Sequence, residues 1–248
     1  MTLKNYCIKI ISSFFILITL IATSLTYANA ESRDTVRIAT VNFQPIWGDK
    51  KANLNKMSKF IKEAADNGAE LVLFPEMCLT GYAMEQNDSM LRGDRMQVKL
   101  AEPFNGESAK TIAKIAKKNG IYVVYGYPEK IGNDPLNVYN SAVAIDPNGK
   151  ILGSYRKVHP FGSEVIWAKT GTEPFLFDTP WGKIGISICY DTYNYPELSR
   201  YYAAKGAKII LNPTATSWGY YSASDLKDGQ PLNDGKPING NNKAWVNR

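Results

Sequence analysis

The chain alternates short apolar runs with helix-period segments, and this alternation restricts its fold more than any other feature of the sequence. The runs with the β-branched and aromatic content of strands are TVRIATVNF (35–43), ELVLFPE (70–76), IYVVYGY (121–127) and KIILNPTA (208–215). Helix-period segments begin near Asn53 and Ser108 and stop at Gly68 and Gly120. Strand–helix–strand units of this kind predict an α/β fold.

Two turn signals indicate that the predicted sheet is not purely parallel. DPNG (146–149) separates SAVAI from KILGSY, and PWG (180–182) separates FLFD from KIGISIC, so two antiparallel hairpins are expected. Pro196 suits the first turn of a further helix, which Gly206 ends. Several of the strands are apolar on both faces, so helices or a second sheet must cover them.

The first thirty residues have the layout of a secretory signal peptide. Lys4 and Lys9 give a positive start, an apolar stretch follows, and ANA (28–30) forms an A-x-A cleavage pattern. We therefore expect residues 1–30 to be removed and residues 31–248 to form a single domain without a stable membrane anchor. The mature protein is then exported, either periplasmic or secreted. A retained membrane anchor is the alternative interpretation of the same segment.

Charge and cysteine content exclude several classes of function. The formal net charge is +6, and lysines alternate with glutamates instead of clustering, so no nucleic-acid partner is expected. The mature chain keeps Cys78 and Cys189, which an oxidising compartment could join in a disulfide. His159 is the only histidine and there is no C-x-x-C pair, so no metal site is expected.

Three polar residues follow apolar runs, at the expected strand ends where α/β sheets place their sites. They are Glu76 after LVLFP, Lys157 in SYRKVHPFG and Cys189 at the end of GISIC. Taken singly, Glu76 could cap a turn, Lys157 could lie on the surface and Cys189 could belong to the core. Taken together they form a working set, because a carboxylate can accept the thiol proton and an ammonium can stabilise the thiolate and an oxyanion.

Two neighbouring residues bear on this set. Histidine is the usual base for a cysteine nucleophile, but the sequence KVHP around His159 favours a packed, hydrogen-bonded ring. Glu76 is therefore the better candidate for the base. Cys78 lies two residues after Glu76, and we expect it to be a packed thiol, because a bridge to Cys189 would remove the nucleophile.

Three segments, LVLFPEMCLTGY, YRKVHPFG and GISICYDTYNYPEL, resemble in order and spacing the three motifs of the nitrilase superfamily, the carbon–nitrogen hydrolases. The resemblance covers about residues 36–216 and includes the opening VRIATVNFQPIWGDKKANLNKM. It implies a Glu-Lys-Cys triad of Glu76, Lys157 and Cys189, with no cofactor. It also implies a four-layer α-β-β-α sandwich, which commonly forms homodimers or higher oligomers.

The resemblance further implies a mechanism through a cysteine thioester. Glu76 takes the thiol proton, Cys189 attacks the amide carbon, and Lys157 and the backbone N–H of Tyr190 hold the oxyanion. Glu164 corresponds to a second glutamate of many relatives, which positions the substrate or assists the base. A solvated loop carboxylate is the alternative interpretation of Glu164.

The substrate is less well specified than the mechanism. Pocket candidates are Phe161, Tyr193, Tyr195 and Trp218, each of which could instead belong to the core. Cys189 is followed by Tyr-Asp, which amidase-like members often carry, whereas nitrilases commonly carry Trp-Glu, so the resemblance favours a small carboxamide as substrate. The alternatives are nitrile hydrolysis by the same triad, an inactive or binding relative, and a membrane-anchored acyltransferase, which would need several transmembrane helices.

The C-terminal end differs from the family pattern. Relatives continue beyond the equivalent of NKAWVNR (242–248) with a long helix and further strands. We therefore expect the C-terminal part of the domain to be missing from this chain, which would leave a sheet edge and apolar surface uncovered.

Overall fold

The computed structural model describes residues 33–82, 91–134, 136–215, 226–227 and 230–231. The chain divides into two compact units, Met1–Thr35 and Val36–Arg248. All the helices and strands given below belong to the second unit. The predicted signal peptide and Trp218 lie outside the described residues, so both stay predictions.

The larger sheet has five strands, and their order in the sheet follows their order in the chain. They are β1 (Ile38–Thr40), β2 (Leu71–Leu73), β3 (Tyr122–Lys130), β4 (Val138–Ile145) and β5 (Ile151–Arg156). The first three strands pair in parallel, whereas β3, β4 and β5 pair antiparallel. Parallel neighbours need crossover connections, and the chain supplies them with α2 (Lys50–Asp66) and α4 (Glu107–Asn119).

The DPNG turn (146–149) between β4 and β5 confirms the first predicted hairpin. Asp146 Oδ1 accepts hydrogen bonds from the backbone N–H groups of Asn148 at 2.9 Å and Lys150 at 2.8 Å. Gly149 has a φ of 79°, in the left-handed region that glycine adopts without strain. The turn is set by its own residues, which explains why the sequence predicts it.

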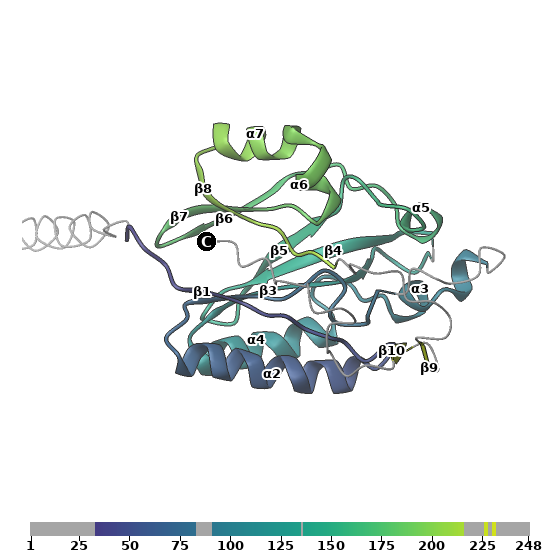
Figure 1. Ribbon diagram of the computed structural model, residues 1–248, viewed down its shortest axis with the longest axis horizontal. Coiled ribbons are helices and arrows are strands. Elements are labelled where there is room, and N and C mark those ends of the chain that lie inside the picture. Colours follow the sequence, from purple (N-terminus) through teal and green to yellow (C-terminus); the bar gives the residue numbers. More distant parts are fainter. Residues whose placement is uncertain (1–32, 83–90, 135, 216–225, 228–229, 232–248) are drawn as a thin grey trace, which may run out of the picture. The chain divides into compact units, whose positions relative to one another are not determined.

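Helices α2 and α4 pack against each other on one face of the larger sheet (Figure 1). Their side chains Met57, Ile61, Ile112 and Ala116 form a core with sheet residues such as Val123. The apolar stripe predicted from the sequence is therefore the buried face of each helix.

The starts of both helices differ from the prediction. Asp49, and not Asn53, caps α2, because its carboxylate accepts the backbone N–H of Ala52 at 2.9 Å. Gly106 is the N-cap of α4, two residues before Ser108. Asn53 is instead a buried residue inside α2.

The buried amide of Asn53 connects α2 to two loops. It donates to the carbonyl groups of Ile46 at 2.8 Å and Leu79 at 3.0 Å. Its oxygen accepts the backbone N–H of Ile46 at 2.7 Å. These loop contacts explain why Asn53, which the sequence suggested as a helix cap, is an asparagine.

The smaller sheet has three strands, in the order β6 (Phe175–Thr179), β7 (Gly182–Ile186) and β8 (Ala207–Leu211). The first two form the second predicted hairpin, and β8 pairs with β7 in parallel. Helix α7 (Pro196–Ala204) connects β7 to β8, has the predicted proline in its first turn, and buries Leu198 and Tyr202 against the sheet.

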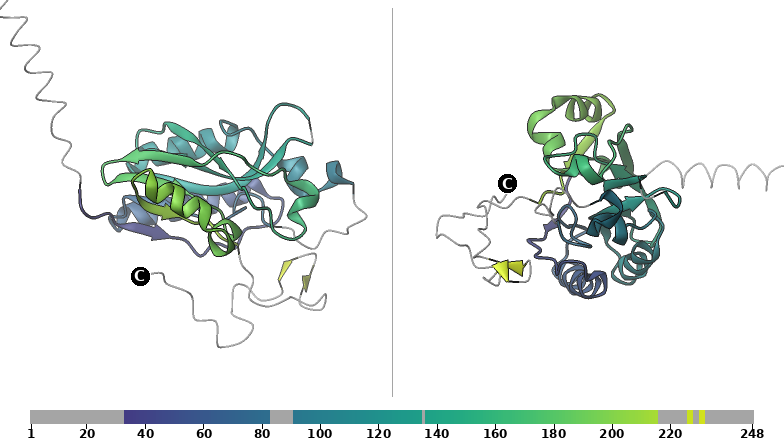
Figure 2. Two further views of the ribbon diagram at one scale, coloured as in Figure 1. Left: turned by 90° about the horizontal axis from the view of Figure 1, so that it is seen from above. Right: turned by 90° about the vertical axis from the view of Figure 1, so that its right-hand side faces the viewer.

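The two sheets face each other across a second apolar core. Its members include Val124, Ala142, Tyr155, Ile184 and Ile186. Along β3, Val124 faces this core while Val123 and Tyr125 face the helices, as the two-residue period of a strand requires. The layers are therefore helices, larger sheet, smaller sheet and helix (Figure 2), which confirms the predicted α-β-β-α sandwich.

The remaining described elements are short. They are η1 (Arg92–Asp94), α3 (Met96–Leu100), α5 (Glu164–Trp167), α6 (Tyr190–Asn194), β9 (Leu226–Lys227) and β10 (Gln230–Pro231). The last two pair antiparallel. In the described part of the chain, no helix has both the length and the apolar character of a membrane span.

Gly126 of β3 lies directly against the segment that carries Glu76. A Cβ at this position would lie 2.4 Å from the backbone N of Met77 and 2.6 Å from Cα of Glu76, so the backbone would have to move. We expect Gly126→Ala to lower the free energy of unfolding by about 1–3 kcal/mol, because it overpacks this contact. Urea unfolding tests this, with Gly93→Ala as the control, since a Cβ there has no neighbour within 4 Å. Equal stability of the two variants would contradict the prediction.

Candidate active site

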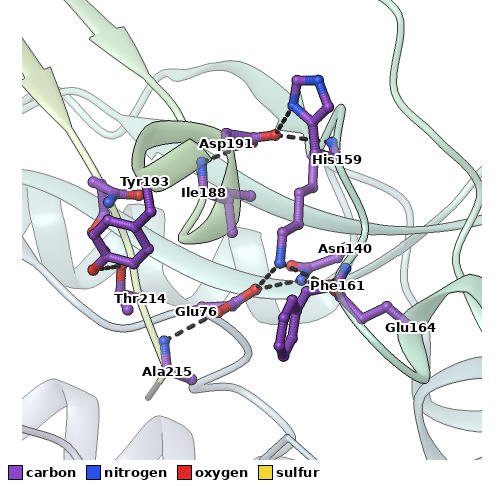
Figure 3. Close-up of polar contacts among 12 residues, drawn as sticks. Glu76, Asn140, His159, Phe161, Glu164, Ile188, Asp191, Tyr193, Thr214 and Ala215 are labelled. Atoms are coloured by element: carbon purple, nitrogen blue, oxygen red, sulfur yellow. Dashed lines mark hydrogen bonds and ion pairs between the residues drawn. The ribbon is translucent and has the colours of Figure 1, made fainter. Parts of the chain in front are cut away.

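Glu76 lies in the turn after β2, and only 2% of the residue is exposed. Its Oε1 accepts a hydrogen bond from Asn140 Nδ2 at 2.7 Å (Figure 3). The same oxygen accepts one from Lys157 Nζ, also at 2.7 Å. Its Oε2 accepts the backbone N–H of Ala215, from the segment after β8, at 3.0 Å. A buried carboxylate is costly without such donors, so this network explains how an apolar run can end in a glutamate.

Lys157 follows β5 directly and brings one ammonium group to the network. Its Nζ lies 2.7 Å from Glu76 Oε1 and 2.7 Å from Glu164 Oε2. Its backbone N–H donates to the carbonyl of Asn140 at 2.8 Å, and its carbonyl accepts the N–H of Gly171 at 2.8 Å. The main chain of Lys157 is therefore held on both sides, and the alternative of a surface lysine does not apply.

Glu164 is the first residue of α5 and is fully buried, so it is not a solvated loop carboxylate. Its Oε2 accepts the backbone N–H of Phe161 at 2.6 Å, in addition to the bond from Lys157. Its Oε1 accepts a hydrogen bond from Asn140 Nδ2. The predicted auxiliary glutamate thus shares two donors with Glu76.

The cluster places two carboxylates against one ammonium. Burial raises the pKa of Glu76, attraction to Lys157 opposes this rise, and repulsion from Glu164 adds to it. Burial alone would lower the pKa of Lys157, but the charges of Glu76 and Glu164 outweigh it and raise the pKa. The ammonium therefore stays protonated, and Glu76 has the raised proton affinity that suits a general base.

Cys189 occupies a strained turn between β7 and α6. Its φ of 47° lies in the left-handed region, where a residue other than glycine costs about 1–3 kcal/mol. The backbone N–H groups of Ser187 and Cys189 donate to the carbonyls of Leu211 at 3.0 Å and Pro213 at 3.1 Å. These bonds hold the turn beside the end of β8 and fix the direction of the side chain.

The Cys189 turn and Glu76 bind the same segment after β8, since the N–H of Cys189 donates to the carbonyl of Pro213 and Glu76 accepts the N–H of Ala215. Burial and the negative charge of Glu76 raise the pKa of the thiol to about 12, and Lys157 offsets this only in part. The thiol is therefore protonated near neutral pH and needs a base before it can act as a nucleophile. Glu76 is placed to be that base.

Tyr190 opens α6, directly after the thiol. The backbone N–H groups of the first helical turn have no acceptor within their own helix. An N–H at this position is suited to an oxyanion that forms next to Cys189. That role of Tyr190 stays a prediction.

Asp191 is a buried residue that the sequence analysis did not assign to the site. Its Oδ2 accepts the backbone N–H of Ile188 at 3.0 Å and the hydroxyl of Tyr155 at 2.7 Å. Its Oδ1 accepts the backbone N–H of His159 at 2.8 Å. Asp191 therefore connects the segment after β5 to the turn that carries Cys189. The sequence did offer a signal for this role, because a carboxylate next to the end of an apolar strand needs buried partners.

His159 is a packed histidine, as predicted. Its Nδ1 lies 2.9 Å from Asp191 Oδ1. Its ring stacks on Tyr195, with ring centroids 3.6 Å apart and planes inclined by 4°. Tyr195 therefore supports His159, and the histidine points to Asp191 and not to the thiol.

Two further residues of the cluster were missed. Asn140 of β4 donates to both Glu76 and Glu164, and burial together with the charges of Glu76 and Glu164 raises the pKa of Tyr82. An asparagine in an otherwise apolar strand, VYNSAVAI, was a usable signal, because asparagine is depleted in strands. Tyr82 carried no such signal.

Two of the three described pocket candidates have exposed side chains, and the third, Tyr195, stacks on His159. Phe161 is 44% exposed and Tyr193 is 60% exposed. The ring of Phe161 lies 5.0 Å from that of Tyr190, and the hydroxyl of Tyr193 lies 3.3 Å from Thr214 Oγ1. Both stay predictions as residues that line a substrate pocket.

Cys78 and Cys189 are free thiols. Cys78 packs in the core between the helices and the larger sheet, with its Sγ 3.5 Å from the carbonyl of Gly126. The prediction of a packed thiol is confirmed, and the alternative of a disulfide is wrong. Within the described ranges, no group of three or more histidine, cysteine, aspartate or glutamate residues is placed to hold a metal ion.

Known proteins share this sequence pattern. Residues 37–227 match the model of the family described as Carbon-nitrogen hydrolase. A nitrilase of Pyrococcus abyssi is 36% identical over 179 residues, which cover 72% of this chain and 64% of that protein. The omega-amidase NIT2-B of Xenopus laevis is 34% identical over 191 residues, which cover 72% of this chain and 63% of that protein. The chain thus spans less than two thirds of the length of either curated relative.

Solved structures of an amidase share the fold. An amidase from Nesterenkonia sp. is 27% identical, with a TM-score of 0.61 over 74% of this chain and 66% of that one. A variant of the amidase from Nesterenkonia sp. AN1 is 26% identical, with a TM-score of 0.60 over 74% of this chain and 66% of that one. That structure shows covalent addition of the acetamide moiety of fluoroacetamide at its active site cysteine.

Proposed function

The chain belongs to the carbon–nitrogen hydrolase family of the nitrilase superfamily, and from this premise we propose that it is a thiol amidohydrolase. It hydrolyses a small carboxamide to the carboxylate and ammonia. The observation that carries the proposal is that Glu76 and the Cys189 turn bind the same segment after β8, while Lys157 Nζ lies 2.7 Å from the Glu76 carboxylate. A nucleophile, its base and a cation are thereby brought together.

In the first half of the proposed reaction, Glu76 accepts the Sγ proton as Cys189 attacks the amide carbon. The carbonyl oxygen becomes an oxyanion, which the Lys157 ammonium and the Tyr190 N–H stabilise. Glu76 then gives its proton to the amide nitrogen, so the C–N bond breaks and ammonia leaves. The product is a thioester on Cys189. The covalent adduct in the Nesterenkonia variant supports a nucleophilic cysteine, although it joins an acetamide moiety and not an acyl group to the sulfur.

In the second half, water replaces the sulfur. Glu76 removes a proton from the water, which attacks the thioester carbon through a second oxyanion at the same donors. Collapse releases the carboxylate, and the thiol of Cys189 recovers its proton from Glu76. Glu76 is therefore the base in both halves of the reaction. This agrees with the position of His159, whose ring contacts Asp191 and is not needed as a second base.

Two observations favour an amide over a nitrile as the substrate. Cys189 is followed by the Tyr-Asp that amidase-like members often carry. The solved structures that resemble this chain include amidases, and the curated relatives include several named nitrilases as well as omega-amidases. Nitrile hydrolysis by the same triad is the second candidate.

The test pairs each amide with the nitrile of the same carbon chain. Purified protein is incubated with short aliphatic amides, ω-amides and their matched nitriles, and the ammonia released is measured. We expect ammonia from at least one amide and none from the nitriles. Ammonia from nitriles alone would overturn the amide assignment, and ammonia from neither set would overturn the hydrolytic function.

A further inference from the structure

Asn140 lies between the two buried glutamates of the site, and the sequence motifs do not include it. We propose that Asn140 is a positioning residue of the active site, which holds Glu76 and Glu164 apart and keeps the base ionised and correctly oriented. This inference rests on the proposed function. Its basis is a set of three contacts made by one side chain and its own backbone.

The first two contacts come from the side-chain amide. Nδ2 donates to Glu76 Oε1 at 2.7 Å and also to Glu164 Oε1 (Figure 3). Both partners are acceptors, so the amide can present only its N–H₂ group to them. Its two hydrogens therefore bridge two carboxylates that would otherwise repel each other in a buried place.

The third contact comes from the main chain. The carbonyl of Asn140 accepts the backbone N–H of Lys157 at 2.8 Å. The residue thus fixes the strand end that carries the ammonium, while its side chain fixes both carboxylates that the ammonium binds. The antiparallel register pairs Ser141 with Arg156, so Asn140 and Lys157 are the next opposed residues along the two strands.

An asparagine side chain is unfavourable at this buried position unless its amide makes hydrogen bonds that the site needs. Asn140 is fully buried in a strand of largely apolar residues. Among the described residues, its Oδ1 is buried and has no hydrogen-bond partner. A buried acceptor without a partner is unfavourable for folding, and an apolar residue of the same shape would avoid that cost. A leucine would fill similar space but could not donate the two hydrogen bonds that Nδ2 gives to the glutamates.

The expected effect is on the ionisation of Glu76. The groups that face this carboxylate are Lys157 after β5, Glu164 on α5, Cys189 after β7 and Tyr82 after the β2 turn. A hydrogen bond donated to a carboxylate favours its charged form. Without the Asn140 donor, burial and repulsion from Glu164 raise the pKa of Glu76 further. Because Glu76 must be ionised to act as the base, the acid limb of the pH profile moves to higher pH.

The experiment compares the wild type with Asn140→Leu and Asn140→Asp. The pH dependence of kcat/KM for the best amide is measured for each. We expect the acid limb to move up by about one pH unit in Asn140→Leu, and further in Asn140→Asp, which adds a third carboxylate. The alkaline limb stays in place. At the pH optimum, kcat falls by about 10- to 100-fold, because the base is no longer held in position.

Asn53→Leu is the matched control. Asn53 is also fully buried, but its amide binds only backbone groups of Ile46 and Leu79. This variant loses a buried amide away from the carboxylates, so its acid limb stays at the wild-type position. A shift of equal size in Asn53→Leu would show that any loss of packing moves the limb, and the inference would be overturned.

The remaining outcomes separate this inference from the proposed function. A wild type that releases no ammonia contradicts the function, and the limb is then read from the pH dependence of Cys189 alkylation by iodoacetamide, followed by intact mass. A folded Asn140 variant with the wild-type limb overturns the inference while the function stands. Failure of both Asn140 variants to fold, with Asn53→Leu folded, assigns the residue a purely structural role and also overturns it.

Discussion

Cys189→Ala is expected to abolish amide hydrolysis, with a loss of kcat/KM of about 10⁴-fold or more, as for other enzymes that lose their nucleophile. The alanine keeps the Cβ, so it adopts the same left-handed backbone at the same cost, and the φ of 47° does not change. The free energy of unfolding should therefore change little. The measurement is ammonia release, combined with mass spectrometry of the wild type and the variant during turnover. A thioester adduct is expected on the wild type only.

Cys78→Ala provides the matched control for this loss. It removes the other buried thiol of the described chain, which packs in the helix–sheet core and hydrogen-bonds only to the Gly126 carbonyl. The variant should lose some stability and keep most of its activity. Substantial hydrolysis by Cys189→Ala, or an adduct that remains on it, would exclude Cys189 as the nucleophile.

Local signals in the sequence predicted the turns, the C-terminal end of α4 and the start of α7, but not the starts of α2 and α4. Gly120 takes the left-handed conformation that ends α4, and Pro196 opens α7, because both conformations depend on the residue itself. Strand lengths were predicted less well. The run 35–43 yields only Ile38–Thr40, since a strand extends only as far as its partner, and β2 spans Leu71–Leu73.

The catalytic candidates were predictable for a similar reason, and their supporting residues were not. Glu76, Lys157 and Cys189 each follow a predicted strand, so chain order alone places them at strand ends. Asn140 reaches the cluster only because β4 pairs with β5 in one particular register. Asp191 reaches His159 only because α6 turns back over the segment after β5. Such contacts depend on pairing between distant segments, which no short window of sequence contains.

Lys157→Met is expected to cause the largest loss of stability among single changes in the site. The methionine fills similar space but leaves the carboxylates of Glu76 and Glu164 buried without their ammonium. Removal of one partner from a buried ion pair typically costs about 3–5 kcal/mol. Activity should also be lost, because the oxyanion loses its cation. Chemical unfolding and ammonia release are the two measurements.

The pH dependence of this loss has a definite sign. Without Lys157, nothing of comparable strength opposes burial, so the pKa of Glu76 in the folded protein rises further above its ordinary value of 4.5. A raised carboxylate pKa means that the folded state binds the proton more tightly, so stability falls as the pH rises through and above the ordinary value. The deficit of Lys157→Met relative to the wild type should therefore be smaller at about pH 5 than at about pH 8.

Two further variants separate charge from packing in this loss. Lys62→Met makes the same substitution in the exposed pair of Lys62 and Asp66, and exposed pairs contribute only about 0–1 kcal/mol. The double variant Lys157→Met/Glu164→Gln removes one of the two unpaired carboxylates, so it should recover part of the stability but none of the activity. Recovery of activity together with stability would mean that Lys157 serves the fold alone. Lys157→Met that is as stable as the wild type at about pH 8 would contradict the buried ion cluster itself.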